Sequence, residues 1–364
     1  MEHFRLARPL LPATATEVHM VIEELDPAAA PEWDDYVARK EGANCYHLHG
    51  WRTAGERGYG LRAPFLAARA RPRGELLGVL PLFFVRSSPL SGYATTGLFG
   101  AYGPVLADDF EISGLLLREA CRRARDVGLA SLRFKGLGEE PGAQGFVPLD
   151  HWVVARLPLW SSPDQAWAAI RGKERNLVRK AREHGLEVRR GTDELRAFYD
   201  VLAANMHHKG APIYGQRWIE EVVRSFGDAA EVVTVHHRGR CVAGAVTLTF
   251  KGVITVPFLS ARPESLPLRP NVLLVWDLIA RGCEQGLGTL DLGTSLRGSS
   301  SLSFKLHWGC RVEPRSILVC PLRGGPPALD VQSPMVRAGV ALWQRLPRAW
   351  ADALGPQVCR RFLA

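Results

Sequence analysis

An internal repeat limits the folds open to this chain more than any other feature. Residues 65–84 and 232–250 each have the pattern of a β-hairpin, with apolar and β-branched runs on both sides of a charged turn. Each is followed by a loop with proline, an apolar helix, and a strand that begins after a helix-ending glycine, Gly128 or Gly286. These two glycines are 158 residues apart. The repeated order predicts an α/β fold with mixed sheets, built as two domains of one type.

The repeat also predicts where the domains begin and end. We expect an N-terminal domain over residues 1–158, a C-terminal domain over 159–322, and a linker with a helical tail over 323–364. A helical insertion over 162–226 opens the second domain, at a capping box with proline at the first helical position. Helices are expected over residues 112–127, 162–184, 192–208, 214–226, 272–285 and 333–364.

Charge and composition narrow the classes of function. The net charge of +9 favours polyanionic partners such as phosphates, nucleic acid or acidic lipid headgroups. The seven cysteines are scattered and the paired histidines are adjacent in sequence, so neither a disulfide framework nor a metal site is expected. Apolar runs are too short for a membrane span, and residues 4–12 have no signal-peptide core. We therefore expect a soluble cytoplasmic protein.

The densest basic cluster lies in the first expected helix of the insertion. On a continuous helix, Arg171, Arg175, Arg179 and Arg182 share one face, with Lys180 beside them. Guanidinium groups suit phosphate because each offers planar, paired donors. We therefore predict that this helix face binds phosphate; the alternative is a solvated helix face.

A second candidate site begins at Asp291, which ends a strand before a small-residue turn and a serine-rich loop. Lys305 follows that loop and is one of only seven lysines among 46 basic residues, which suggests that a compact ammonium is needed there. It could stabilise a developing oxyanion, with Asp291 orienting Lys305 or the nucleophile. Alternatively, Asp291 is a capping residue and Lys305 lies over Trp308. The other candidate substrate-binding residues are Tyr214, Asn271, Ser295, Arg297, Phe304 and Trp308.

The turns before the two central helices argue against a usual coenzyme A site. Acetyltransferases of the GNAT type hold the pyrophosphate of coenzyme A on a glycine-rich turn at a helix N-terminus, where free N–H groups face the phosphates. The turns at residues 102–105 and 268–272 are not glycine-rich, and each contains a proline, which has no N–H.

Several motifs in one order resemble a known family. They lie at residues 46–51, 77–82, 102–108, 205–214, 271–276, 304–309, 343–347 and 354–356. Together they resemble the FemAB-like proteins found beside exosortase/PEP-CTERM exopolysaccharide systems, within the Fem group of double-GNAT aminoacyltransferases.

The resemblance implies two tandem GNAT-like domains that move an amino acid from aminoacyl-tRNA to an amine of a cell-wall precursor. It implies that Lys305 assists acyl transfer and that Arg175, Arg179 and Lys180 lie where precursor phosphates bind. Two motifs depart from the family. The turn after Asp291 lacks the family's arginine, although Arg297 is nearby, and residues 206–210 read Met-His-His-Lys-Gly in place of Met-Arg-Asp-Leu-Gly.

The function expected from these observations is N-acyl transfer. The preferred donor is aminoacyl-tRNA and the acceptor an amine of a cell-envelope, peptidoglycan or exopolysaccharide precursor that carries phosphate. One alternative is an acyl-CoA-dependent transferase acting on an amino sugar or small amine, and another is a non-catalytic basic module that binds a polyanion. No tightly bound cofactor is expected. The helical tail either packs on the second domain or contacts a membrane surface.

Overall fold

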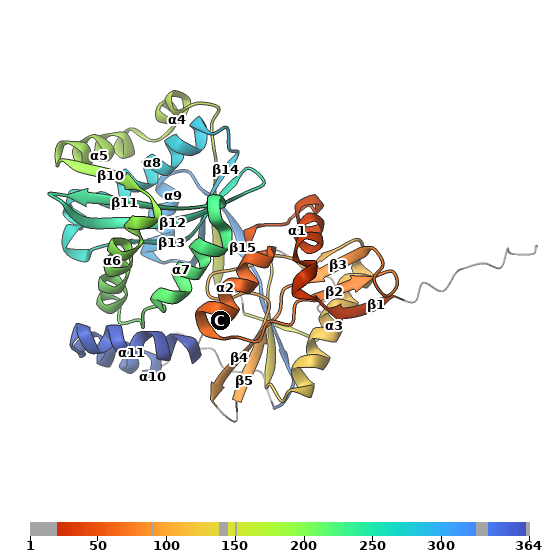
Figure 1. The fold of residues 1–364 in the computed structure, drawn as a ribbon. Coiled ribbons are helices and arrows are strands. Elements are labelled where there is room, and N and C mark those ends of the chain that lie inside the picture. The colour runs from red at the N-terminus through yellow and green to blue at the C-terminus, as the bar shows by residue number, and fades with distance from the viewer. Residues whose placement is uncertain (1–19, 89–90, 138–144, 150, 325–333, 362–364) are drawn as a thin grey trace, which may run out of the picture.

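The computed structural model describes residues 20–88, 91–137, 145–149, 151–324 and 334–361 (Figure 1). These residues form three sheets, with strand orders β1-β2-β3-β6, β4-β5-β7-β16-β8 and β10-β11-β12-β13-β14-β9-β15. The strands are β1 (Val21–Glu24), β2 (Leu66–Arg69), β3 (Leu76–Leu80), β4 (Phe83–Ser88), β5 (Ser91–Thr95), β6 (Leu106–Ala107), β7 (Ser131–Lys135), β8 (Val147–Pro148), β9 (Trp152–Pro158), β10 (Leu186–Arg190), β11 (Ala230–His237), β12 (Arg240–Phe250), β13 (Val253–Ala261), β14 (Thr289–Leu296), β15 (Arg311–Arg315) and β16 (Ile317–Pro321). The helices are α1 (Ala30–Arg39), α2 (His49–Tyr59), α3 (Phe110–Asp126), α4 (Pro163–Ala169), α5 (Gly172–Glu183), α6 (Leu195–His208), α7 (Gln216–Phe226), α8 (Pro270–Glu284), α9 (Ser300–His307), α10 (Pro334–Arg345) and α11 (Arg348–Arg361).

The two hairpins of the repeat have the same register. In the first, β2 pairs antiparallel with β3 and Ala68 lies opposite Gly78. In the second, β11 pairs antiparallel with β12 and Thr234 lies opposite Gly244. Both members of the second pair are 166 residues beyond their counterparts. The expected α/β fold of two similar halves is confirmed.

The central helices of the two halves end in the same way. Gly128 follows α3 with φ 78° and Gly286 follows α8 with φ 67°, a backbone conformation that glycine adopts at little cost. The strand after each helix then pairs in parallel: β7 with β5, and β14 with β13. A parallel pair therefore closes the repeated unit in each half.

The halves differ in how their longest strand runs. In the second half β12 is continuous over 11 residues. In the first half the corresponding segment is split into β3 and β4, which belong to different sheets. The split falls at Pro81, which has no N–H to donate to a neighbouring strand.

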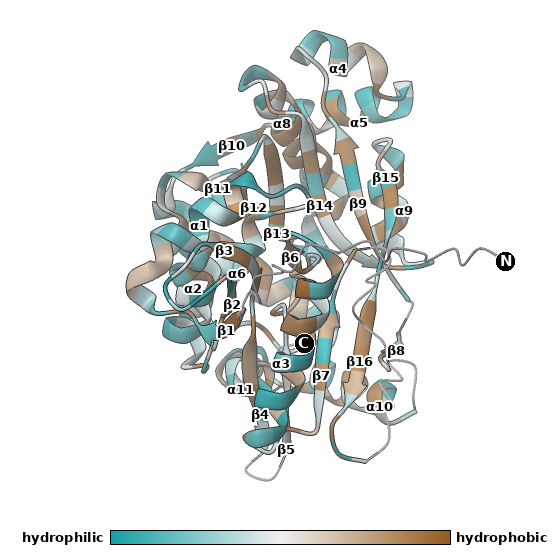
Figure 2. Cartoon of the chain, turned by 90° about the vertical axis from the view of Figure 1, so that its right-hand side faces the viewer, coloured by the Kyte–Doolittle hydropathy of each residue, from teal (hydrophilic) through white to brown (hydrophobic). Residues whose placement is uncertain are grey.

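The sheets do not divide at the expected domain boundaries. Strand β9, expected to end the N-terminal domain, lies between β14 and β15 in the seven-stranded sheet of the second half. Strand β16, expected to end the C-terminal domain, pairs with β7 and β8 in the first half. Figure 2 shows β16 as a largely brown, apolar strand beside β7. Each half thus contains a strand from the other half's expected range.

The insertion differs in two ways from the sequence expectation. The helix expected over 162–184 is two helices, α4 and α5, because Ile170 and Arg171 have extended backbones with ψ near 150°. Strand β10, which follows the helix-ending Gly185, was not expected and forms the edge of the seven-stranded sheet. The other two helices of the insertion, α6 and α7, occur close to their expected ranges.

The tail is helical, as expected, and forms α10 and α11. Both helices lie below α6 in Figure 1. Residues 325–333 of the expected linker and tail, and the N-terminal residues 4–12, lie outside the described residues. None of the helices that the structure describes is long and apolar enough to cross a membrane.

Aromatic packing joins the two halves. Trp51 of α2 and Trp218 of α7 are fully buried and lie edge to face, with ring centroids 5.1 Å apart. The helices approach closely at Gly58, where a Cβ would lie 2.8 Å from the Trp218 Cα. One hydrophobic core therefore runs through both halves and fixes their relative position.

Candidate functional site

An irregularity in β14 shapes the centre of the candidate site. The pairing of β14 with β9 shifts register between Asp291 and Thr294, and Gly293 in between has φ 70°. The Asp291 Oδ1 accepts a hydrogen bond of 2.8 Å from the Gly293 N–H. The carboxylate thus stabilises the bulge that exposes the neighbouring carbonyl groups to α9.

Lys305 lies on α9 and points to this bulge. Its Nζ donates to the carbonyl oxygens of Gly293 at 3.0 Å and Thr294 at 3.1 Å. The residue is 9% exposed, and burial lowers the pKa of Lys305 to about 8, against the opposing attraction of Asp291. At neutral pH its ammonium is therefore still mostly charged. With two donors on carbonyls, it has a third N–H with which to bind an oxyanion.

The serine-rich segment before Lys305 is helical, which corrects the expected loop. Ser299 is the N-cap of α9, and its hydroxyl accepts from the Leu302 N–H at 3.2 Å. The alternative in which Lys305 lies over Trp308 is also wrong, since the ammonium bonds to carbonyls. Trp308 is instead a core residue, 2% exposed.

Asp291 joins groups from three parts of the chain. Tyr102, from the first half, donates its hydroxyl to Asp291 Oδ2. The same oxygen accepts from Arg156 Nε of β9 at 3.0 Å, and Arg156 Nη1 bonds Glu313 of β15 at 3.0 Å. Burial and the adjacent carboxylate raise the pKa of Tyr102, so its phenol stays protonated. The carboxylate is 2% exposed and fully partnered, which suits an orienting role.

Two buried basic side chains position Tyr102. Lys135 Nζ donates to the Phe99 carbonyl at 2.8 Å, and Arg315 Nη2 donates to the Ala101 carbonyl at 3.1 Å. Burial lowers the pKa of Lys135, and lowers that of Arg315 to about 10. These bonds hold a loop in which Phe99 has φ 51°, unusual for a residue with a side chain. The loop therefore delivers Tyr102 to Asp291 in a fixed orientation.

Sequence reasoning missed this second set of residues. Tyr102 lies in one of the motifs that carried the family resemblance, and Lys135 is one of the seven lysines, so both had a signal. Arg156 and Arg315 carried no such signal, because nothing in the sequence distinguishes them from the other arginines. Their roles depend on β9 and β15 pairing side by side.

The remaining residues predicted near Lys305 are only partly gathered there. Ser295 is buried on β14, with its Oγ 3.4 Å from that of Ser301 on α9. Phe304 is half-buried, and its ring centroid lies 6.5 Å from that of Trp308. Arg297 is exposed beyond the end of β14. Ser295 and Phe304 thus flank the site, and Arg297 lies at the surface.

Tyr214 and Asn271 lie in other surroundings. Tyr214 packs its ring on Phe99 at 4.5 Å and on Phe258 at 5.6 Å, and burial raises the pKa of Tyr214. Asn271 is in the first turn of α8, with a buried Oδ1 that has no hydrogen-bond partner in the described part of the chain. Tyr214 therefore supports the loop that carries Tyr102, through its contact with Phe99. Within the residues that the structure describes, Asn271 forms no hydrogen bond to that loop.

The first two arginines of the predicted basic cluster bind backbone carbonyl groups. Arg171 donates to the carbonyls of His307 at 2.9 Å and Leu306 at 2.6 Å, at the end of α9. Arg175 Nη1 donates to three carbonyls around the end of α4, the shortest at 2.7 Å to Ile170. Both guanidinium groups thus satisfy helix C-termini, and α5 begins directly beside the helix of Lys305.

The free basic groups on α5 are fewer than the sequence suggested. Arg179 and Arg182 lie over the Trp167 ring, with guanidinium carbons 5.5 and 6.0 Å from its centroid. Lys180 is exposed. Among the residues predicted to bind phosphate, the side chains of Arg179 and Lys180 make no hydrogen bond to the described chain, and Arg175 has its Nη1 on carbonyls and keeps its Nε and Nη2 donors.

Part of the chain matches a family model of acyltransferases. Residues 168–304 match the family model described as an acetyltransferase (GNAT) domain. No curated protein shows significant sequence similarity to the chain.

Three solved structures with the same fold are FemX, L-PGS from Bacillus licheniformis and a tandem GNAT protein from the clavulanic acid biosynthesis pathway. FemX has a TM-score of 0.64 at 14% identity, over 83% of this chain and 97% of that one. L-PGS has a TM-score of 0.55 at 14% identity, over 89% of this chain and 99% of that one. The tandem GNAT protein has a TM-score of 0.54 at 11% identity, over 85% of this chain and 100% of that one. The expected tandem GNAT-like fold is confirmed.

A GNAT domain implies acyl-coenzyme A as co-substrate, but the residues here do not fit the usual pyrophosphate cradle. In the first turn of α8, Pro270 has no N–H, and the N–H groups of Val272 and Leu273 bond to the Arg269 carbonyl at 3.0 and 3.3 Å. At the start of α3, the carboxylate of Asp109 accepts from the Ile112 N–H at 2.9 Å. The first turns of both helices therefore offer a phosphate fewer N–H groups than a glycine-rich turn does.

Proposed function

We propose that this GNAT-type acyltransferase transfers an aminoacyl group to an amine of a phosphate-bearing cell-envelope, peptidoglycan or exopolysaccharide precursor, at the site around Lys305. The observation that carries the proposal is the buried ammonium of Lys305, fixed by two carbonyls of the β14 bulge and still charged at neutral pH. A fixed charge of this kind is suited to an oxyanion that forms only during reaction.

The chemistry is attack of a neutral amine on an activated acyl ester. The amine nitrogen bonds to the acyl carbon and gives a tetrahedral intermediate whose former carbonyl oxygen carries negative charge. Lys305 stabilises that oxygen with its third N–H. The ester carbon–oxygen bond then breaks as the carbonyl re-forms, and the proton lost by the amine passes to the leaving oxygen, which departs as a hydroxyl group of the donor. Asp291 keeps the bulge and Tyr102 in place and touches no reacting atom, so we assign it a positioning role.

Two features support an aminoacyl ester as the donor. The first turns of α3 and α8 lack the glycine-rich turn of a usual pyrophosphate cradle, and a side chain or proline takes part of their donors. The chain also has a net charge of +9, which favours a long polyanion such as tRNA. On the acceptor side, Arg179 and Lys180 keep unused donors on α5, the helix that begins beside α9.

Incubating the purified chain with radiolabelled aminoacyl-tRNA and a panel of amine acceptors tests the proposal. Loss of label from tRNA into an amide product that depends on the acceptor is the expected result. Binding of tRNA or of an anionic glycan without any consumption of donor would contradict it and would favour a non-catalytic basic module.

The match of residues 168–304 to an acetyltransferase model favours a second donor, acyl-coenzyme A. The acceptor would then be an amino sugar or small amine. Parallel reactions with labelled acetyl-coenzyme A distinguish the two donors, because only one label should enter the product.

A further inference from the structure

A cleft of about 850 Å³ lies away from the Lys305 site, between β4, the end of α3 and the end of α11. Its floor is apolar and includes Leu61, Phe84 and Leu129. The Ser87 hydroxyl of β4 donates to the Arg361 carbonyl at 3.0 Å, which fixes the end of α11 on the first half. The cleft is therefore formed by packing between elements that are distant in sequence.

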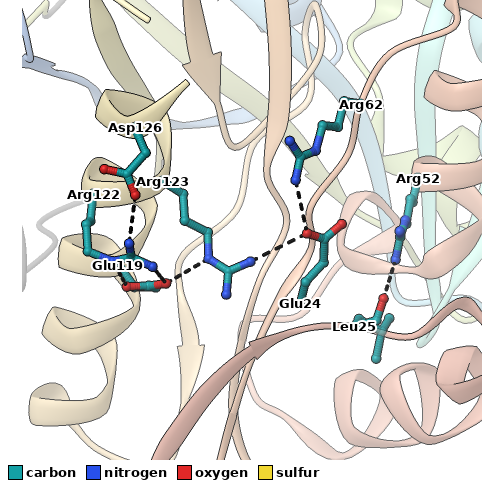
Figure 3. Close-up of polar contacts among 8 residues, drawn as sticks. All are labelled: Glu24, Leu25, Arg52, Arg62, Glu119, Arg122, Arg123 and Asp126. Carbon is teal, nitrogen blue, oxygen red and sulfur yellow. Dashed lines mark hydrogen bonds and ion pairs between the residues drawn. The ribbon is translucent and has the colours of Figure 1, made fainter. Parts of the chain in front are cut away.

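Four arginines line this cleft: Arg62, Arg86, Arg360 and Arg361. Arg86 donates to the Val127 carbonyl at 3.0 Å, and Arg62 lies over Phe84. Figure 3 shows Arg62 also held by Glu24, which in turn contacts Arg123 of the ion-pair network on α3. Across the described chain, Arg360 and Arg361 form no ion pair, and no carboxylate lines the cleft.

An apolar stripe on α11 leads to this cleft. Trp350, Leu354, Gln357 and Arg361 are spaced i, i+4, i+7 and i+11, so they share one helix face. Trp350 is 65% exposed and Leu354 41% exposed, and Gln357 and Arg361 line the cleft. On the preceding α10, Leu342 is 66% exposed. Exposed tryptophan and leucine beside arginine are typical of helices that lie in a membrane interface.

We propose that α10, α11 and the arginine-lined cleft form a docking surface for an anionic membrane. Trp350 and Leu354 enter the headgroup region, and the cleft accepts a lipid phosphate on Arg360 and Arg361 above its apolar floor. Charge complementarity identifies the occupant, because guanidinium groups that form no ion pair with the described residues, beside exposed apolar side chains, match a phosphate joined to an acyl chain. This surface is separate from the proposed acyl-transfer site.

Co-sedimentation of the full chain with vesicles tests the proposal without any activity measurement. We expect binding to phosphatidylcholine vesicles that contain phosphatidylglycerol and much weaker binding to phosphatidylcholine alone. The double variant Arg360→Gln/Arg361→Gln should bind anionic vesicles about 30-fold more weakly. The matched control Arg71→Gln/Arg73→Gln removes the same charge from the β2–β3 turn, far from α11 in Figure 1, and should bind nearly as wild type.

The apolar stripe is tested with Trp350→Ala/Leu354→Ala, which should also lose vesicle binding while circular dichroism stays that of wild type. Equal loss in both arginine double variants would overturn the proposal, since binding would then follow net charge alone. Two other results would also overturn it. One is binding of inorganic phosphate or octyl phosphate through Arg360 and Arg361 without any binding to vesicles. The other is self-association that Trp350→Ala/Leu354→Ala abolishes, again without vesicle binding.

Discussion

Replacing Lys305 with methionine should change how the stability of the protein depends on pH. Met keeps the length of the side chain and removes its titration. In the folded chain the pKa of Lys305 is about 8, against 10.5 for a free lysine. Between these values the unfolded chain holds a proton that the folded chain has lost, so stability rises with pH. From pH 7 to pH 9 this raises the free energy of unfolding of the wild type by about 1.4 kcal/mol.

The assay is urea unfolding of wild type and Lys305→Met at pH 7, 8 and 9. Cysteine and tyrosine ionisation is common to both proteins, so the difference between their free energies of unfolding isolates Lys305. From pH 7 to pH 9, we expect the free energy of unfolding of the wild type to rise by about 1.4 kcal/mol relative to that of Lys305→Met. Lys251→Met, at an exposed turn, is the control and should follow the wild type. Parallel pH dependence in wild type and Lys305→Met would refute the reasoning, because it would mean that Lys305 is not desolvated.

Three further substitutions test the structure around the site. Arg175→Ala should lower the free energy of unfolding by about 1–3 kcal/mol in denaturant titrations, because three carbonyls lose their donor. Arg179→Ala should lower the free energy of unfolding by no more than about 1 kcal/mol, the contact with Trp167, and should weaken binding of phosphate-bearing acceptors with a shallower salt dependence in calorimetry. Gly103→Ala would place a Cβ 2.2 Å from the His47 ring and should lower the thermal midpoint, whereas an unchanged midpoint would show that the loop can move.

The sequence predicted those parts of the fold that local patterns determine. The hairpins, α3 and α8 follow from apolar periodicity and helix-ending glycines, and all are present close to the expected ranges. Asp291 and Lys305 were predicted together because they lie on consecutive elements. The break between α4 and α5 was not predictable, since Arg171 is directed by the end of α9, a tertiary contact.

Long-range pairing accounts for most of the rest. Tyr102 and Asp291 are 189 residues apart, and no local pattern joins them. The exchange of β9 and β16 between the halves depends on strand pairing, which the hydrophobic pattern of a short strand does not specify. Arg156, on β9, enters the site because of that exchange, and Arg315 enters it because β15 pairs with β9. The bonds of Arg175 to the end of α4 were not predicted for a related reason, since they depend on the break between α4 and α5.

The most direct test of the central claim is single-turnover acyl transfer by wild type and Lys305→Ala with a saturating amine. If Lys305 stabilises the oxyanion, the rate of the chemical step should fall by about 100-fold or more while donor affinity changes little. Lys251→Ala should keep the wild-type rate. An unchanged rate in Lys305→Ala would contradict the account, and would place acyl transfer elsewhere in the chain.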